Sequence, residues 1–339
     1  GSQSNFLSSR NYTLKEYCTD IIEAVMTSLD EDNIPHPVII TESGRALVAY
    51  YSILLFNILD VTRFQADPLP ERLPEGCPPQ LEYMVQALKA LTVRNIQEVF
   101  NDAIFYRDET RRLFQHGQAS LRERSLAEQL FWTTISEISR LAREIKNPGA
   151  ELIDLDRVLS DFYYCNFSVF QSLPDSWAIG QLFPIMPIHR LDEEPTRKGI
   201  LADITCDCDG KIDQFIDKRG MKRYLPLHEL KPYEEYILGV FLVGAYQETL
   251  GDLHNLLGDT NVVTISIGDK GEFEFVSEQE GDTVAEVLSY VQYHPKRLFV
   301  RFRATAEQAV RAGKISAQER REIVEAYEAG LRGYTYFER

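Results

Sequence analysis

The segment ITCDCDG, residues 204–210, alternates two thiols with two carboxylates and closes on a glycine. Cys206 and Cys208 could belong to a metal clip or a redox pair, and the acids could bind a cation. A structural turn is a further interpretation, as is one wall of an active site, where a thiol transfers a proton. Zinc is disfavoured because the CxC spacing lacks a second cysteine pair and the six histidines are scattered singly.

Two other segments carry groups suited to a ring nitrogen or a phosphate. TESGR, residues 41–45, follows an apolar, β-branched run, and ligand sites of α/β sheets gather at the carboxyl ends of strands. Glu42 could hold a basic ring nitrogen and Arg45 a phosphate, although a salt-bridged turn would look the same. In VGAYQETLGDLHNLLGDTN, residues 243–261, the Tyr246 hydroxyl could reach a phosphate oxygen or simply end a buried strand.

Composition narrows the class of partner. The 339 residues are 44% hydrophobic and carry a net charge of −16, which suits a well-buried core and an acidic surface. Such a surface repels phosphate backbones, so nucleic acid is not an expected partner, whereas a cationic substrate would be attracted. The five cysteines, an odd number in a long chain, favour a reduced cytoplasmic compartment. No apolar run reaches the roughly 18 residues of a membrane helix.

The first sixty residues predict a helix followed by two strands. Thr13 and Glu16 form the sequence pattern of a capping box, so a helix is expected over 13–29. The apolar runs at 38–42 and 52–61 are expected to be buried strands, the first of them in a parallel sheet.

The rest of the chain separates into helical and β-rich parts. Residues 63–79 are rich in proline and acids, as linkers are, and 80–147 predict a bundle of three or more helices, with one more helix over 147–163. Strands are expected at 163–173, 199–207, 236–246, 262–268 and 272–277. Helix returns at 283–292 and 306–338.

Taken in order, these segments resemble the carboxyl-terminal portion of the biosynthetic arginine decarboxylases. These are pyridoxal phosphate enzymes with an alanine-racemase-like fold, related to ornithine and diaminopimelate decarboxylases. The resemblance covers essentially the whole chain, including the helical insertion, and rests on PHPVIITESGRALVAYYSIL (35–54), YCNFSVFQSLPDSWAIGQLFPIMPIHRL (164–191), ADITCDCDGKIDQFI (202–216), VGAYQETLGDLHNLLGDTNVV (243–263) and AGLRGYTYFE (329–338).

The resemblance implies an α/β plus β fold class with four parts. Residues 1–62 would supply the last strands of a partial (β/α)8 barrel that binds pyridoxal 5'-phosphate, and 63–150 a helical-bundle insertion. Residues 151–281 would form a β-barrel domain with the active-site motifs, and 282–339 a helical C-terminal tail.

The resemblance also implies roles toward the cofactor. Glu42 matches the acid that pairs with the protonated pyridine nitrogen and so keeps the ring an electron sink. Gly44 and Arg45 match the turn that contacts the cofactor phosphate, and Tyr246 matches a tyrosine that binds the same phosphate. A magnesium ion is a further expectation of the family.

Two residues match groups that act on the substrate. Cys206 matches the catalytic cysteine that protonates the reacting carbon, and Asp207 matches the acid that binds the substrate's cationic end. In the family both come from the other subunit, so a homodimer or a dimer of dimers with shared active sites is expected. The chain departs from ornithine-type relatives at Phe167, where they carry an aspartate, and Asp175 is a candidate for the acid that replaces it.

The implied reaction is decarboxylation of L-arginine to agmatine and CO2 in polyamine biosynthesis. The family's Schiff-base lysine and Gly-rich phosphate loop precede the point that matches Gly1, so this chain alone is not expected to turn over. Ornithine, lysine or diaminopimelate is the alternative substrate, against which Phe167 and the helical insertion argue. A non-catalytic, decarboxylase-like regulatory partner is the alternative from another class, although such a protein need not retain the site residues.

Overall fold

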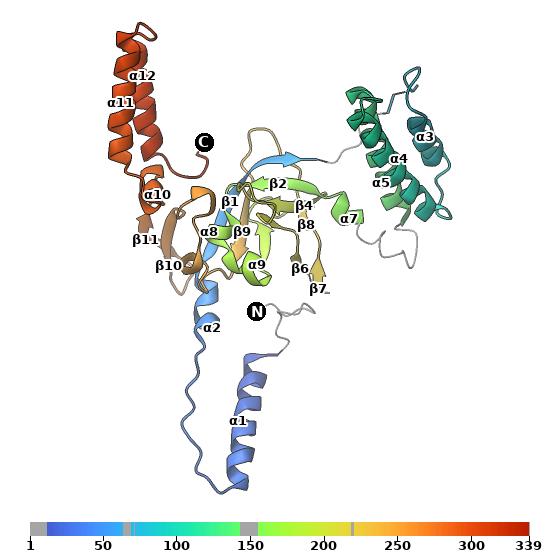
Figure 1. Ribbon diagram of the computed structural model, residues 1–339. Helices are drawn as coiled ribbons and strands as arrows, with labels where there is room; N and C mark the ends of the chain where they lie inside the picture. The colour runs from blue at the N-terminus through green and yellow to red at the C-terminus, as the bar shows by residue number, and fades with distance from the viewer. Residues whose placement is uncertain (1–11, 64–68, 71, 143–154, 218–219, 339) are drawn as a thin grey trace.

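The computed structural model describes a central sheet, a helical bundle and two helical projections (Figure 1), and covers residues 12–63, 69–70, 72–142, 155–217 and 220–338. The sheet has seven strands in the order β3-β9-β1-β2-β4-β5, and β8 also pairs with β4. β2 and β4 are parallel, and the other neighbours are antiparallel. The strands are β1 Ile53–Thr62, β2 Asp161–Cys165, β3 Ile185–Pro187, β4 Arg197–Ala202, β5 Lys211–Ile212, β8 Leu225–Leu227 and β9 Ile237–Phe241.

Strand β1 joins the parts of the sheet. It pairs with β9 along its first half and with β2 along its second. Alternate residues point to one face of a strand, and Phe56 and Ile58 are accordingly buried in the core beneath the sheet. The sheet therefore includes residues 53–62. In the division expected from the sequence, these residues belong to the cofactor-binding part, 1–62.

Where the sequence predicted a β-barrel, the structure has a seven-stranded sheet that nearly closes. β3, at one end of the order, contacts β8, which pairs with β4. Two separate hairpins accompany it: β6 Phe215–Asp217 with β7 Gly220–Lys222, and β10 Val262–Ile267 with β11 Phe273–Gln279.

The expected helical bundle is confirmed as three helices with a core of their own. They are α3 Pro79–Lys89, α4 Ile96–Gln115 and α5 Leu121–Ala142, and they stand to one side of the sheet (Figure 1). Leu81, Leu130 and Ile135 are among the fully buried side chains at the centre of the bundle. Of the further helix expected over 147–163, the described residues contain the short α7 Leu155–Val158, and 147–154 lie outside them.

Three helices follow the hairpin β10–β11 at the other side of the sheet: α10 Val284–Tyr290, α11 Pro295–Arg311 and α12 Ala317–Arg332. The long helix expected over 306–338 is therefore wrong in its bounds. Pro295 begins α11, Gly313 adopts a positive φ of 67° after it, and Ser316 caps α12. The chain then returns to the sheet domain, where the Phe337 N–H donates to Asn166 Oδ1 at 3.1 Å.

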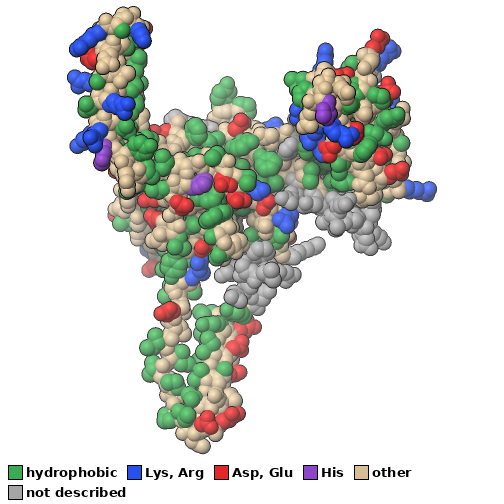
Figure 2. Space-filling view, viewed as in Figure 1, with side chains coloured by type: hydrophobic (Ala, Val, Ile, Leu, Met, Phe, Trp, Pro, Cys, Tyr) green, Lys and Arg blue, Asp and Glu red, His purple; other side chains and the backbone are tan. Residues whose placement is uncertain are grey.

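The expected strand at 38–42 is a second correction. α1 Leu14–Glu31 has the predicted capping box, but 38–42 pairs with no strand among the described residues. Val38 and Ile40 are 89% and 91% exposed, and hydrophobic side chains are visible along this link and α1 (Figure 2). Extended backbone becomes a β-strand only when a neighbouring strand forms hydrogen bonds with its N–H and C=O groups. Among the described residues, no strand lies beside 38–42.

Two more expected strands are shorter than the sequence suggested. β2 stops at Cys165, because Ser168 caps α8 Val169–Ser172, which leads into α9 Pro174–Ile179. β4 stops at Ala202, so the cysteine-rich segment follows the strand instead of lying on it. Among the described helices, none is both long and apolar enough to cross a bilayer.

Candidate functional site

The ITCDCDG segment forms a turn held from beneath by a buried carboxylate. Asp203, the first residue after β4, is 5% exposed. One of its oxygens accepts from the Val169 N–H at 2.8 Å, and the other accepts from the Thr205 N–H at 2.9 Å and hydroxyl at 2.6 Å. Burial raises the pKa of Asp203, and these hydrogen bonds oppose the rise. The turn is thereby tied to the start of α8.

Gly210 closes this turn and has no room for a side chain. The Asp203 N–H donates to its carbonyl oxygen at 2.8 Å. A Cβ on Gly210 would lie 2.2 Å from Asp203 Oδ1 and 2.3 Å from Thr205 Oγ1. Both atoms are committed to the hydrogen bonds that hold the turn, so neither can move away freely.

We expect Gly210→Ala to destabilise the folded chain by about 1–3 kcal/mol, because a methyl group forced into packed atoms must displace them. Gly330→Ala is the matched control, since a Cβ there has no neighbour within 4 Å and alanine favours the helix by up to about 1 kcal/mol. Urea unfolding of the two variants measures both effects. Equal stability of the two would mean that the turn accommodates a side chain.

Cys206 and Asp207 are exposed at the tip of the turn, opposite a second segment. The Asn255 side-chain amide donates to Cys206 Sγ at 3.2 Å, and His254 Nε2 lies 3.8 Å from Asp207 Oδ2. The His254 ring packs against Phe170 of α8, with ring centroids 4.3 Å apart. His254 and Asn255 lie within the motif at 243–261, but the sequence alone indicated no role for either of them.

The exposed acids of the turn do not form a suitable magnesium site. The ligand atoms of Asp207, Cys208 and Asp209 lie within 4.8 Å of one another, and all three residues are exposed. Magnesium prefers hard oxygen ligands in octahedral geometry, and a thiol is a poor substitute. No chemical step is therefore assigned to a metal here.

A second cluster joins the TESGR and GAYQ segments. Gly44 begins α2 Gly44–Val48, and a Cβ on it would lie 2.2 Å from the Tyr246 hydroxyl oxygen. The Arg45 guanidinium lies 5.7 Å from the centroid of the Tyr246 ring. Tyr246 has a positive φ of 73°, an uncommon conformation for a tyrosine that tends to mark functional sites.

Asp175 belongs to this cluster through contacts within the chain. It is 7% exposed, and its Oδ2 accepts from Arg45 Nη2 at 3.1 Å and from Gln247 Nε2 at 2.8 Å. Gln247, which the sequence analysis did not single out, also accepts from the Asp175 N–H at 3.1 Å. These contacts make Asp175 a group that orients Arg45.

Phe167, which stands where ornithine-type relatives carry an aspartate, faces the core. Its ring stacks on that of Phe56, with ring centroids 4.3 Å apart.

The second cluster fits a bound phosphate. A guanidinium and a hydroxyl are strong donors to phosphate oxygens, and glycine at position 44 lets the Tyr246 hydroxyl approach the start of α2. Glu42 is exposed two residues before α2. Among the described contacts, none joins Cys206 or Asp207 directly to Gly44, Arg45 or Tyr246.

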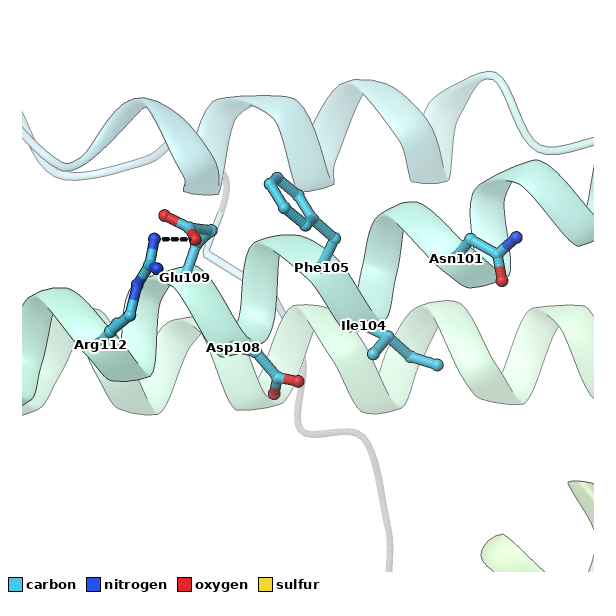
Figure 3. A pocket seen from close by; sticks show the side chains of 6 residues that line it. All are labelled: Asn101, Ile104, Phe105, Asp108, Glu109 and Arg112. Atoms are coloured by element: carbon cyan, nitrogen blue, oxygen red, sulfur yellow. Dashed lines mark hydrogen bonds and ion pairs between the residues drawn. The ribbon is translucent and has the colours of Figure 1, made fainter.

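Two surface hollows lie away from both clusters. One, of about 380 Å³, is on α4 and is lined by charged and apolar residues, including the ion pair of Arg112 with Glu109 (Figure 3). The other, of about 420 Å³, is near His228, where hydrogen bonds from Arg190 and Lys231 hold the pKa of Glu193 at about 2. In both hollows acids and bases pair with each other, so neither competes with the predicted residues as a site.

Comparison with known proteins shows which proteins the chain resembles. Residues 74–156 match the arginine decarboxylase helical bundle domain, and 284–337 match the arginine decarboxylase C-terminal helical extension. The chain is 46% identical over 340 residues to a biosynthetic arginine decarboxylase of Thermosynechococcus vestitus, covering 99% of this chain and 52% of that protein. It is 46% identical to the enzyme of the same name from Bacteroides thetaiotaomicron, covering 99% of this chain and 53% of that one.

A solved structure gives the same result. The crystal structure of the biosynthetic arginine decarboxylase SpeA from Campylobacter jejuni matches with a TM-score of 0.80 and 31% identity, covering 99% of this chain and 54% of that one. The chain thus spans about half the length of the relatives it matches. Its similarity to them extends over almost every residue, so this chain matches about half of a biosynthetic arginine decarboxylase and contains two domains of that family.

Proposed function

We propose that the chain is the carboxyl-terminal part of an enzyme that decarboxylates L-arginine to agmatine and CO2 in polyamine biosynthesis. The observation that carries the proposal is 46% identity over 99% of the chain to proteins named biosynthetic arginine decarboxylase. The proposed parts are a segment of the cofactor-binding barrel within 1–62, whose strand β1 belongs to the central sheet, an insertion over 63–150, a β-barrel domain over 151–281 and a helical tail over 282–339.

Pyridoxal 5'-phosphate, when bound, would supply the electron sink for loss of CO2. The residues that would hold it are Glu42 at the ring nitrogen, with Arg45 and Tyr246 at the phosphate. Gly44 would allow the Tyr246 hydroxyl to lie close to the backbone at the phosphate, since any side chain there collides with that hydroxyl. Asp175 would keep the Arg45 guanidinium in place through its 3.1 Å contact.

Cys206 and Asp207 would act on the substrate. When CO2 leaves, the bond electrons remain at the Cα of the substrate, and Cys206 Sγ–H gives that carbon its proton. The thiolate that remains recovers a proton from solvent. Asp207 would bind the guanidinium through charge-assisted hydrogen bonds, and the net charge of −16 would draw the cationic substrate toward the protein.

We infer an active site shared between subunits, as the family resemblance implies for Cys206 and Asp207. A homodimer, or a dimer of dimers, would bring Cys206 and Asp207 of one copy to Glu42, Arg45 and Tyr246 of another. The five cysteines form no disulfide, which supports a reducing cytoplasmic location.

The test is an assay of CO2 release with this chain co-expressed with the remaining half of the length that its relatives have. Arginine, ornithine, lysine and diaminopimelate are offered separately, with pyridoxal 5'-phosphate present. Arginine-selective release, lost when either half is omitted, is the expected result. Selective release of CO2 from another of these amino acids would mean that arginine is not the substrate. No release from a folded complex would favour the non-catalytic regulatory partner.

A further inference from the structure

We propose that Asn255 is a positioning residue for the Cys206 thiol, with its neighbour His254 holding Asp207. The role of the Cys206 thiol as a proton donor rests on the proposed function, whereas the contacts of Asn255 and His254 do not depend on it. A surface amide and a surface imidazole meet the thiol and the carboxylate of one turn, at 3.2 Å and 3.8 Å.

Both segments are fixed on the same support, the stretch 166–172 that follows β2 and includes α8. On one side, the Ile204 N–H donates to the Phe167 carbonyl at 3.2 Å, next to the Asp203 contact with α8. On the other side, the Asp252 N–H donates to the Phe170 carbonyl at 3.1 Å. A shared support fixes the distance between two loops better than either loop could alone.

The backbone of the second segment is shaped to present the amide of Asn255. The short helix η3 His254–Leu256 contains two successive residues with positive φ, Asn255 at 58° and Leu256 at 59°. Asparagine adopts this conformation readily, whereas leucine does so at a cost of about 1 kcal/mol or more. Leu257, the next residue, is buried and anchors the segment in the interior, and its burial offsets this conformational cost.

The contact has a chemical consequence for the turn. An amide N–H directed at sulfur restricts the rotation of the thiol and keeps Sγ at one position. When Sγ gives up its proton, negative charge develops on sulfur, and the same donor stabilises it without reorganisation. His254, packed against Phe170, limits the movement of the Asp207 carboxylate in the same way.

The first test needs no substrate or cofactor and uses this chain as it is. Iodoacetamide alkylation of Cys206 at pH 7.5 is compared with that of Cys208, exposed in the same turn, by peptide mass spectrometry. Asn255→Asp replaces the donor with a negative charge of the same shape, which disfavours the thiolate. We expect the ratio of Cys206 to Cys208 alkylation to fall about fivefold.

Asn33→Asp is the matched control, because Asn33 also has a positive φ, of 54°, and lies just after α1. We expect it to leave the ratio unchanged. An unchanged ratio in the Asn255→Asp variant as well would overturn the proposal. This result is independent of enzymatic activity, so it separates failure of the proposal from failure of the proposed function.

The second test uses the active complex and the variant Asn255→Gly, which accepts the same backbone and removes the donor. We expect kcat for arginine to fall about tenfold with KM changed less than about twofold, since the proton donor and not substrate binding is affected. In the Cys206→Ala background the same change should cause no further loss. Fully additive losses, or a loss confined to KM, would contradict a role through the thiol.

Discussion

Replacing Cys206 with alanine is expected to lower kcat for arginine by about 100- to 1000-fold in the active complex while the cofactor stays bound. A positioned proton donor contributes typically 10²- to 10⁴-fold to a proton transfer, and water reaching an exposed turn replaces part of it. Cys206 lies on a turn that Asp203 and Gly210 hold from beneath, so removal of its sulfur leaves the support unchanged. Single-turnover kinetics and product analysis measure the effect.

Cys208→Ala is the matched control for this prediction. Cys208 is exposed in the same turn, and the resemblance assigns it no role. Its removal should leave kcat within about twofold, because Cys208 has no assigned contact with the substrate and a substitution at an exposed position has little effect on stability. If Cys206→Ala kept the wild-type kcat and product distribution, the thiol would not be the proton donor.

Replacing Asp207 with asparagine is expected to raise KM for arginine roughly thirtyfold with a small change in kcat. Hydrogen bonds to a charged group contribute about 1.5–3 kcal/mol, and the neutral amide loses the charge but keeps the shape. Asp207 Oδ1 accepts from the Asp209 N–H at 3.0 Å, and the amide oxygen of asparagine can still accept that bond. The turn should therefore survive, and steady-state kinetics report binding alone.

Asp209→Asn provides the comparison. It removes one negative charge two residues away, so a general loss of negative potential would raise KM in both variants. We expect the Asp209 variant to change KM less than about fivefold, because Asp209 has no assigned hydrogen bond to the guanidinium and a water-exposed charge pair contributes only about 0–1 kcal/mol. Equal effects in the two variants would place the guanidinium elsewhere.

The sequence predicted what depends on local pattern. The capping box at Thr13 and the helical spacing of apolar residues over 80–147 depend on residues only a few positions apart. Helix α1 and the helices of the bundle could therefore be predicted from the sequence. The motifs around Glu42, Cys206, Asp207 and Tyr246 predicted the family, which the comparisons bear out.

Partners distant in sequence could not be predicted. The run at 38–42 has every local property of a buried strand, yet pairing requires another strand beside it. The place of β1 between β9 and β2 depends on contacts across more than a hundred residues. The strand expected at 199–207 ends early, at Ala202, for a related reason: the Asp203 carboxylate accepts a buried hydrogen bond from the Val169 N–H, 34 residues earlier, and the chain leaves the sheet there.

By itself, then, the sequence determined the family, the types of residue that could do chemistry, and the helices with local caps. Only the tertiary structure decided which groups meet: Asp175 with Arg45, Asn255 with Cys206, and His254 with Asp207. The physical reason is that hydrophobic period and capping are encoded within a few residues. A hydrogen bond or ion pair depends on a few ångströms of separation, which the packing of the whole sheet and its loops sets.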